Sequence, residues 1–143
     1  MQAEQAQERA RAALADRGLR ATRQRVLVLA EVMRERNDAT AQDVYRRLRD
    51  QGAGVGLATV YRTLGALAEA RLVDTLSHHP GELCYRYCGE GHHHHLVCSG
   101  CHRVIEVADC DLDEWVGRVT AGHGFVPTAH HVEVTGLCVA CAA

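Results

Sequence analysis

Apolar residues recur every three or four positions through the first 70 residues of the chain, which is the spacing of amphipathic helices. An Ala-rich segment with alternating charges, residues 4–16, ends before Gly18 and predicts a first helix. Thr22 and Thr40 stand where side-chain oxygens can cap two further helices. We expect a fourth helix over residues 58–70, with Val60, Leu64 and Leu67 facing the core.

The apolar pattern changes after residue 71 from helical spacing to the alternation of strands. Residues 72–76 and 83–87 alternate in this way, and the segment 77–81 between them has the composition of a turn. Several short helices followed by a two-stranded hairpin are typical of a winged helix-turn-helix. Residues 1–88 are therefore predicted to form a winged-helix DNA-binding domain.

A second, smaller pattern occupies residues 92–143 and follows a Gly-Glu-Gly hinge at residues 89–91. Segments 93–97, 104–107, 131–137 and the stretch beginning at Phe125 are predicted strands, and residues 111–121 a helix. The apolar residues of that helix are expected to face inward. The fold class is then α+β, a winged helix-turn-helix domain plus a small α/β domain. About 50 residues rarely hold a stable core without a metal or a partner chain. The inward positions of the helix are Leu112, Trp115, Val116 and Val119.

Charge also divides the chain into two parts. Residues 1–71 hold 13 of the 16 arginines and 9 acidic residues, a net charge of +4, whereas residues 72–143 hold 3 arginines and 9 acidic residues, a net charge of −6. The first half suits a polyanion and the second suits cations. No apolar run approaches the length of a membrane span, and the N-terminus lacks a signal-peptide pattern, so we expect a cytoplasmic protein without a membrane partner.

All ten histidines and all seven cysteines lie in the acidic half. Without a secretion signal, these cysteines favour metal or redox chemistry over a disulfide framework. Four histidines are consecutive, and strand alternation would point His92 and His94 to one face and His93 and His95 to the other. The run therefore predicts two pairs of metal ligands. A solvated polar tract or a tag remnant is the alternative, although neither explains the Leu-Val pair and the CxxC motif that follow.

Two CxxC pairs, Cys98/Cys101 and Cys138/Cys141, supply four thiols. Four thiolates leave no open coordination position on a tetrahedral ion, which describes a structural zinc site. Such a site would hold the C-terminal segment against the histidine-bearing strand.

Other chemistries compete for these motifs. The segment from Cys98 to His102 matches the CxxCH pattern of c-type haem attachment, and a CxxC near histidines can act as a dithiol oxidoreductase. The haem reading lacks an export signal and leaves the second CxxC unused, and the redox reading lacks a strand-CxxC-helix order. A zinc hydrolase needs an open three-ligand site with a general base, and no such set is recognisable. We therefore expect no enzyme activity and no organic cofactor.

The start of the predicted fourth helix carries residue types that read DNA grooves. Tyr61 and Arg62 suit thymine methyl groups and guanine edges or phosphates, and they lie beside Thr59 and Thr63 at positions expected to be exposed. Upstream arginines could neutralise phosphates next to this helix. Each residue alone has a plain structural alternative, but together on a helix-turn-helix they favour DNA. The upstream arginines are Arg20, Arg23 and Arg25.

The sequence resembles the ferric uptake regulator family over nearly its whole length. The resemblance is carried by GLRATRQR (residues 18–25), GLATVYRTL (56–64), HHHHLVCSGC (92–101) and the terminal CxxC. Within that family the chain is most similar to the zinc uptake regulators of actinobacterial type, because a thiol at Cys88 precedes the hinge and four unbroken histidines follow it. The resemblance implies a homodimeric, metal-activated repressor of palindromic operator DNA that controls zinc uptake genes and binds two to three Zn²⁺ per subunit.

The resemblance also implies roles for individual residues. Arg20 would lie near the minor groove, with Thr59, Tyr61 and Arg62 at the DNA. Cys84 and Cys110 fit no predicted site and are expected to be small buried hydrophobic residues. A repressor of the same family that responds to iron(II) or peroxide is the alternative function. The regulatory zinc site would comprise Asp74, Cys88, His93 and His95, and a second regulatory site His92, His94, Asp113 and His130, with His131 as a competitor for the last ligand.

Overall fold

The computed structural model describes residues 2–35, 37–79, 81–88 and 91–143. The chain divides into two compact units, Met1–Gly89 and Glu90–Ala143. The hinge predicted at residues 89–91 falls mostly outside the described residues, as does residue 80 of the predicted turn.

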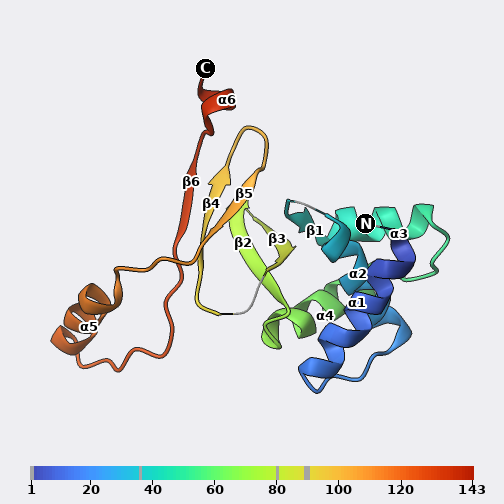
Figure 1. Ribbon diagram of the computed structural model, residues 1–143, viewed down its shortest axis with the longest axis horizontal. Coiled ribbons are helices and arrows are strands. Elements are labelled where there is room, and N and C mark those ends of the chain that lie inside the picture. The colour runs from blue at the N-terminus through green and yellow to red at the C-terminus, as the bar shows by residue number, and fades with distance from the viewer. Residues whose placement is uncertain (1, 36, 80, 89–90) are drawn as a thin grey trace. The chain divides into compact units, whose positions relative to one another are not determined.

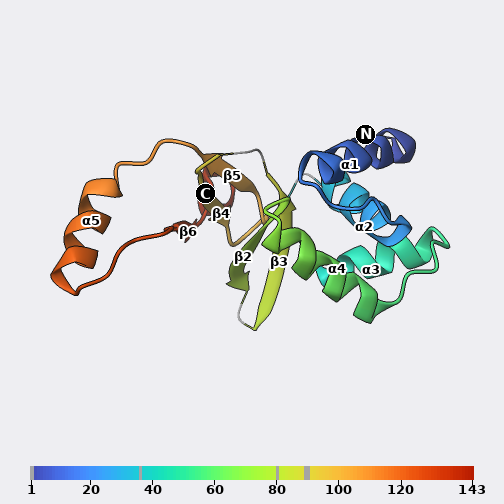
Figure 2. The same cartoon turned by 90° about the horizontal axis from the view of Figure 1, so that it is seen from below.

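Four helices build the first unit: α1 (Ala3–Asp16), α2 (Arg23–Arg34), α3 (Ala41–Asp50) and α4 (Leu57–Glu69). They pack against one another in both views (Figure 1, Figure 2). The predicted caps are confirmed, since the Thr22 hydroxyl accepts from the Arg25 backbone N–H at 3.3 Å and Thr40 forms a capping box with Asp43. Local sequence signals therefore account for where α2 and α3 begin.

The core of the first unit lies between these helices. Leu48, Leu64 and Leu67 are almost fully buried, as predicted for an apolar face at helical spacing. Thr63 was predicted to be exposed at the start of α4, and that prediction is wrong because its side chain is buried. It lies three residues after Val60, on the helix face that packs into the core, and so it is not available to a ligand.

A three-stranded sheet completes the first unit in the order β1-β3-β2. The predicted hairpin is present as β2 (Val73–His79) and β3 (Glu82–Tyr87), which pair antiparallel. The additional strand β1 (Ala39–Thr40) has no counterpart among the predicted elements, and it pairs with β3 immediately before α3. Helices followed by this hairpin form the predicted winged helix-turn-helix.

The second unit has a sheet in the order β5-β4-β6. Its strands are β4 (His94–Cys98), β5 (Val104–Val107) and β6 (Glu133–Gly136); β5 is antiparallel to β4, and β6 is parallel to it. The helix α5 (Asp113–Gly122) lies away from this sheet at the end of two extended connections (Figure 1). A short helix α6 (Val139–Ala142) was not predicted. The predicted strand beginning at Phe125 is wrong, since residues 125–132 have no regular secondary structure.

The second unit buries few apolar side chains among the described residues. Val97 and Val104 are buried with Cys98, whereas α5 contributes no buried residue and Trp115 is 53% exposed. The predicted inward face of that helix is therefore wrong for a single chain, because no other element of its own unit covers it. Large apolar side chains are exposed throughout this unit at Leu96, Ile105, Trp115, Val119, Phe125, Val126, Val134, Leu137 and Val139.

Membrane spans were not expected from the sequence. Among the described residues, every helix is too short or too polar to cross a bilayer.

Candidate metal centres and nucleic-acid interface

Four cysteines meet at one end of the second unit's sheet. Cys98 ends β4, Cys101 lies in the turn toward β5, and Cys138 and Cys141 lie at the beginning of α6 and within it. The parallel pairing of β4 with β6 sets Cys98 opposite Gly136, two residues before Cys138. Strand register thus joins two CxxC motifs that are far apart in the sequence.

The four sulfur atoms lie within 4.8 Å of one another, and all are free thiols. The Sγ atoms of Cys101 and Cys138 are 3.8 Å apart. Sulfur ligands of a tetrahedral zinc ion are also about 3.8 Å apart, given a Zn–S bond of about 2.3 Å. The spacing and the all-sulfur donor set therefore fit the structural zinc site predicted from the sequence.

The surroundings of this cluster favour a thiolate at Cys98 and disfavour one at Cys141. Backbone N–H groups of Cys101 and Cys138 point at the Cys98 sulfur, at 3.5 and 3.3 Å, and lower the pKa of Cys98 to about 6. The neighbouring sulfurs of Cys138, Cys98 and Cys101 instead raise the pKa of Cys141 to about 12. Four thiols this close cannot all ionise without a cation between them, and a divalent ion would supply that charge.

The predicted alternation of the histidine run is present. The ring centroids of His92 and His94 are 4.6 Å apart, and those of His93 and His95 are 4.9 Å apart. The four consecutive histidines therefore form two pairs on opposite faces of the chain, as period-two side-chain placement requires.

A cluster of His92, His94, Cys110 and His130 forms on one of these faces. Cys110 Sγ lies 3.2 Å from Nε2 of His94 and 3.2 Å from Nε2 of His130. His130, and not His131, lies in this cluster, and Cys110 lies where Asp113 was predicted. Asp113 is the first residue of α5, the helix that stands apart from the sheet, and it does not join these histidines.

Residues of the other predicted set are divided between the two units. In the first unit, Asp74 lies on β2 and Cys88 follows β3; burial and the Asp74 carboxylate raise the pKa of the Cys88 thiol well above its ordinary value. Arg86 donates to the Cys88 sulfur at 3.2 Å and opposes this shift. In the second unit, His93 Nδ1 lies 2.9 Å from the Gly91 carbonyl oxygen, and its Nε2 lies 3.7 Å from a Glu106 carboxylate oxygen.

The start of α4 presents the residues expected at DNA. Tyr61 is 47% exposed, and exposed Arg62 donates to the Thr59 hydroxyl at 3.3 Å. Arg20 is also exposed, and Arg25 donates to its carbonyl oxygen at 3.0 Å. Arg25 therefore holds the backbone that carries Arg20.

The other upstream arginine stabilises a loop. The guanidinium of Arg23 donates to the Ala53 carbonyl oxygen in the loop before α4. Arg23 and Arg25 are thus engaged with backbone, which leaves Arg20 and Arg62 as the more direct candidates for DNA contact.

The family model of the ferric uptake regulators matches residues 16–135, which include α2 to α4, the hairpin and most of the clustered cysteines and histidines. The chain belongs to the ferric uptake regulator family. A zinc uptake regulation protein of Mycobacterium tuberculosis is 43% identical over 124 residues, covering 87% of this chain and 95% of that protein. A ferric uptake regulation protein of Escherichia coli K12 is 35% identical over 128 residues, covering 88% and 86%.

Solved structures agree with this membership of the ferric uptake regulator family. A zinc uptake regulator in complex with zinc and DNA aligns with a TM-score of 0.81 and 25% identity, covering 99% of this chain and 96% of that one. The alignment supports the fold of a ferric uptake regulator, namely an N-terminal winged helix followed by a small α/β domain.

Two cysteines lay outside every predicted site of this family member. Cys84 is buried, and desolvation is the main cause that raises the pKa of its thiol to about 12. The prediction of a small buried hydrophobic residue is confirmed for Cys84. Cys110 is only partly buried and lies among histidines, so the same prediction is wrong for it. One feature of the sequence could have indicated that Cys110 lies at this cluster: it is only three residues before Asp113, the acidic ligand predicted there.

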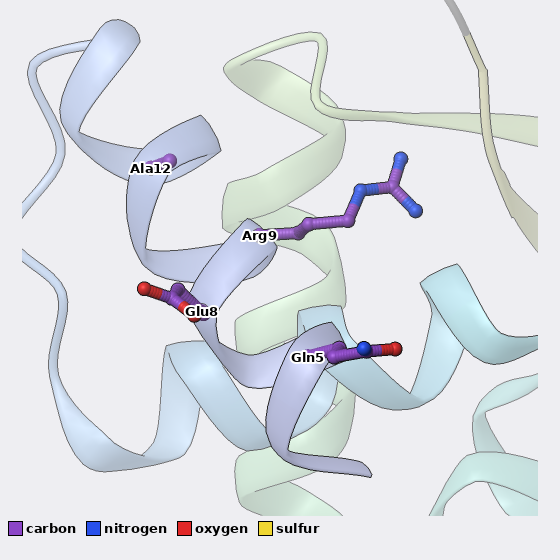
Figure 3. A pocket seen from close by; sticks show the side chains of 4 residues that line it. All are labelled: Gln5, Glu8, Arg9 and Ala12. Carbon is purple, nitrogen blue, oxygen red and sulfur yellow. The ribbon is translucent and has the colours of Figure 1, made fainter. Parts of the chain in front are cut away.

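A shallow hollow on α1 offers no comparable chemistry. Figure 3 shows its lining, which comprises Gln5, Glu8, Arg9 and Ala12, all exposed on one helix. The Arg9 guanidinium lies 5.9 Å from the centre of the Tyr87 ring, which gives it a packing role. The clusters of cysteines and histidines and the start of α4 remain the candidate functional sites.

Proposed function

We propose that this chain is a zinc-responsive transcriptional repressor that binds palindromic operator DNA as a metal-loaded homodimer and controls zinc uptake genes. The protein would be a regulator and not an enzyme, and it would act in the cytoplasm, where it meets its DNA. One observation carries the choice of zinc: identity is 43% to a zinc uptake regulation protein over 87% of this chain, against 37% and 35% to the ferric uptake regulation proteins of Shigella flexneri and Escherichia coli K12.

The donor atoms support the same choice. Thiolate and imidazole ligands suit zinc, whereas iron(II) sensors generally rely on nitrogen and oxygen ligands. We propose that Cys98, Cys101, Cys138 and Cys141 hold a structural zinc ion. The second unit buries little apolar surface of its own, so the energy of metal binding would stabilise its fold directly.

We propose that Asp74, Cys88, His93 and His95 form the regulatory site. Two of these residues belong to each unit, so an ion held by all four would fix the units in one relative orientation. Without it the units would be free to reorient. A fixed orientation in both protomers would set the two α4 helices about 34 Å apart, one turn of DNA, and raise operator affinity.

A homodimer also accounts for the exposed apolar residues of the second unit. Trp115 and Val119 on α5 and Val134 on β6 are half-exposed in the single chain. Apolar surface of this extent usually marks a protein interface. We propose that a second copy covers it, which would complete the core that the single chain lacks.

Operator binding with different metals tests the proposal. The metal content of the purified protein is measured first, and gel-shift titrations then compare zinc, iron(II), manganese and nickel on operator DNA. Zinc should give the tightest binding at the lowest free metal concentration. Selective activation by iron(II) would reject zinc sensing and favour the iron-responsive alternative.

A single substitution separates the regulatory site from the structural one. Cys88→Ser should lose zinc-dependent operator binding while retaining the dimer and one tightly held zinc per chain at the four cysteines. Unchanged zinc dependence in this variant would remove Cys88 from the regulatory site.

A further inference from the structure

We infer that Cys110 is a metal ligand, and that the cluster of His92, His94, Cys110 and His130 binds a divalent ion through three imidazoles and one thiolate. This replaces the carboxylate of Asp113 that resemblance to the family implies. The inference rests on the proposed function only for the kind of ion, a zinc-like divalent cation, and it does not depend on DNA binding.

Distances support a preformed site. The Cys110 sulfur contacts Nε2 of two histidines at 3.2 Å, and the His92 ring lies 4.6 Å from His94 and 4.5 Å from His130, measured between ring centroids. In a tetrahedral zinc site a sulfur and a nitrogen ligand lie about 3.5 Å apart, from bond lengths of about 2.3 and 2.0 Å. Only small movements would seat an ion among these four atoms.

The chain brings these ligands together through its sheet. His94 begins β4, and the backbone N–H of His95 donates to the Val132 carbonyl at 3.1 Å, two residues after His130. Pairing of β4 with the segment that enters β6 therefore sets His130 beside the histidine strand. Cys110 comes from the connection after β5, which pairs with the other edge of β4.

The ligand type changes what the site binds. A thiolate is softer than a carboxylate, so three imidazoles with one thiolate favour zinc or cobalt over manganese and iron(II). Binding would release the proton of the Cys110 thiol to solvent. Both proposed exchangeable sites of this chain would then carry one thiolate each, Cys88 in one and Cys110 in the other.

One contact must change when the ion binds. Val132 donates its backbone N–H to Nδ1 of His94 at 3.1 Å, so a neutral ring carries its proton on Nε2, facing Cys110. Coordination through Nε2 would place that proton on Nδ1, which could no longer accept from Val132. The amide resonance of Val132 should therefore shift when the site is filled.

Cobalt provides a direct readout, because a sulfur-to-cobalt charge-transfer band appears only where a thiolate is bound. The test uses full-length Cys88→Ser protein that retains zinc at its four cysteines, verified by metal analysis, and adds Co²⁺. We expect a charge-transfer band with Co²⁺. Adding Zn²⁺ to the same protein in place of Co²⁺ should shift the amide resonance of Val132. Adding Cys110→Ser should abolish the band and lower Co²⁺ affinity at this site at least about tenfold.

Two further variants in the same background decide between the ligands. Asp113→Asn should keep the band, and Cys110→Asp should lose it while keeping the visible bands of tetrahedral cobalt, because an acid replaces the thiol. A band that survives Cys110→Ser would overturn the inference, as would its loss in Asp113→Asn. Each variant must retain its structural zinc and its helix content, so that misfolding is not read as ligand loss.

Failure of this inference is distinguishable from failure of the proposed function. A cobalt band in Cys88→Ser protein, together with no zinc-dependent operator binding by the unmodified chain, would retain the thiolate site and reject the repressor proposal. Zinc-dependent operator binding by the unmodified chain, together with no band in Cys88→Ser protein, would retain the repressor and reject Cys110 as a ligand.

Discussion

Gly100 lies directly against Cys141: a Cβ atom built on Gly100 would be 3.0 Å from both the Cβ and the Sγ atoms of Cys141. Real Cβ atoms essentially never come closer than this distance, and the neighbouring atom is itself a proposed zinc ligand. A side chain at Gly100 would therefore force Cys141 to shift by a few tenths of an ångström, because the turn and the helix α6 approach each other at the four-cysteine cluster.

Gly100→Ala should weaken zinc binding at the four cysteines. The added methyl group must displace Cys141, so we expect zinc to transfer to a chelator at least several-fold faster than from the unmodified protein. Gly136→Ala is the matched control, because it lies in the same unit and a Cβ there meets nothing within 4 Å. Equal release rates for the two variants would contradict a steric role of Gly100.

Removal of the structural zinc should unfold the second unit selectively. Its described residues bury few apolar side chains, whereas the first unit has an extensive core between four helices. Exhaustive chelation should therefore collapse the amide resonances of residues 91–143 and leave those of α1 to α4 dispersed. Restored dispersion on adding zinc back is the control, and a second unit that stays folded without metal would refute the argument.

Local signals predicted the first unit well. Thr22 and Thr40 cap helices through contacts within three residues, and the hairpin follows from alternation around a turn. The strand β1 was missed because its two residues pair with β3, more than 40 positions away. Thr63 lies at the exposed start of α4 but on the face it shares with buried Val60, and the position in the helix does not show that burial.

For the metal clusters too, the sequence predicted the parts that depend on local spacing and missed the part that depends on distant pairing. The CxxC spacing and the alternation of four histidines are local and were predicted. Cys110 lies 16 residues from His94 and 20 from His130, so only strand pairing shows that it joins them. The apolar spacing also predicted the helix α5, but among the described residues no element of the single chain buries its apolar face.

The capping box at the start of α3 should contribute measurably to the stability of the first unit. Thr40 and Asp43 exchange hydrogen bonds at 3.0 and 3.1 Å. Thr40→Ala should lower the free energy of unfolding of this unit by about 1 kcal/mol, and Thr40→Ser should preserve it. Urea unfolding followed by signals from the first unit measures the difference; equal losses in both variants would exclude the cap.

The same contact predicts a pH dependence. Burial raises the pKa of Asp43, but hydrogen bonds from Thr40 and the charges of Arg46 and Arg47 outweigh it and lower the pKa below 3.8. A lowered pKa in the folded state means that this stabilisation is complete above pH 3.8 and is lost as the pH falls through the folded value. Asp43→Asn should lessen the acid sensitivity of the first unit over that range, relative to the unmodified chain.

Arg62 should determine operator preference more than general DNA affinity. It is exposed at the start of α4, with Thr59 holding its guanidinium, and a bidentate contact to a guanine edge requires that planar fork. Arg62→Ala should weaken operator binding by about 1–3 kcal/mol, roughly fivefold to 150-fold, with a smaller loss on scrambled DNA. Gel-shift titrations on both DNAs at one salt concentration and saturating zinc measure this.

Two control variants separate base reading from charge. Arg62→Lys keeps the charge but loses the fork, so it should restore binding to scrambled DNA without restoring operator preference. Arg11→Ala removes one exposed arginine from α1, outside the proposed interface, and should leave both affinities nearly unchanged. If Arg62→Ala weakened operator and scrambled DNA equally, Arg62 would be a phosphate contact, and base recognition would have to come from other residues near the start of α4, with Tyr61 as the first candidate.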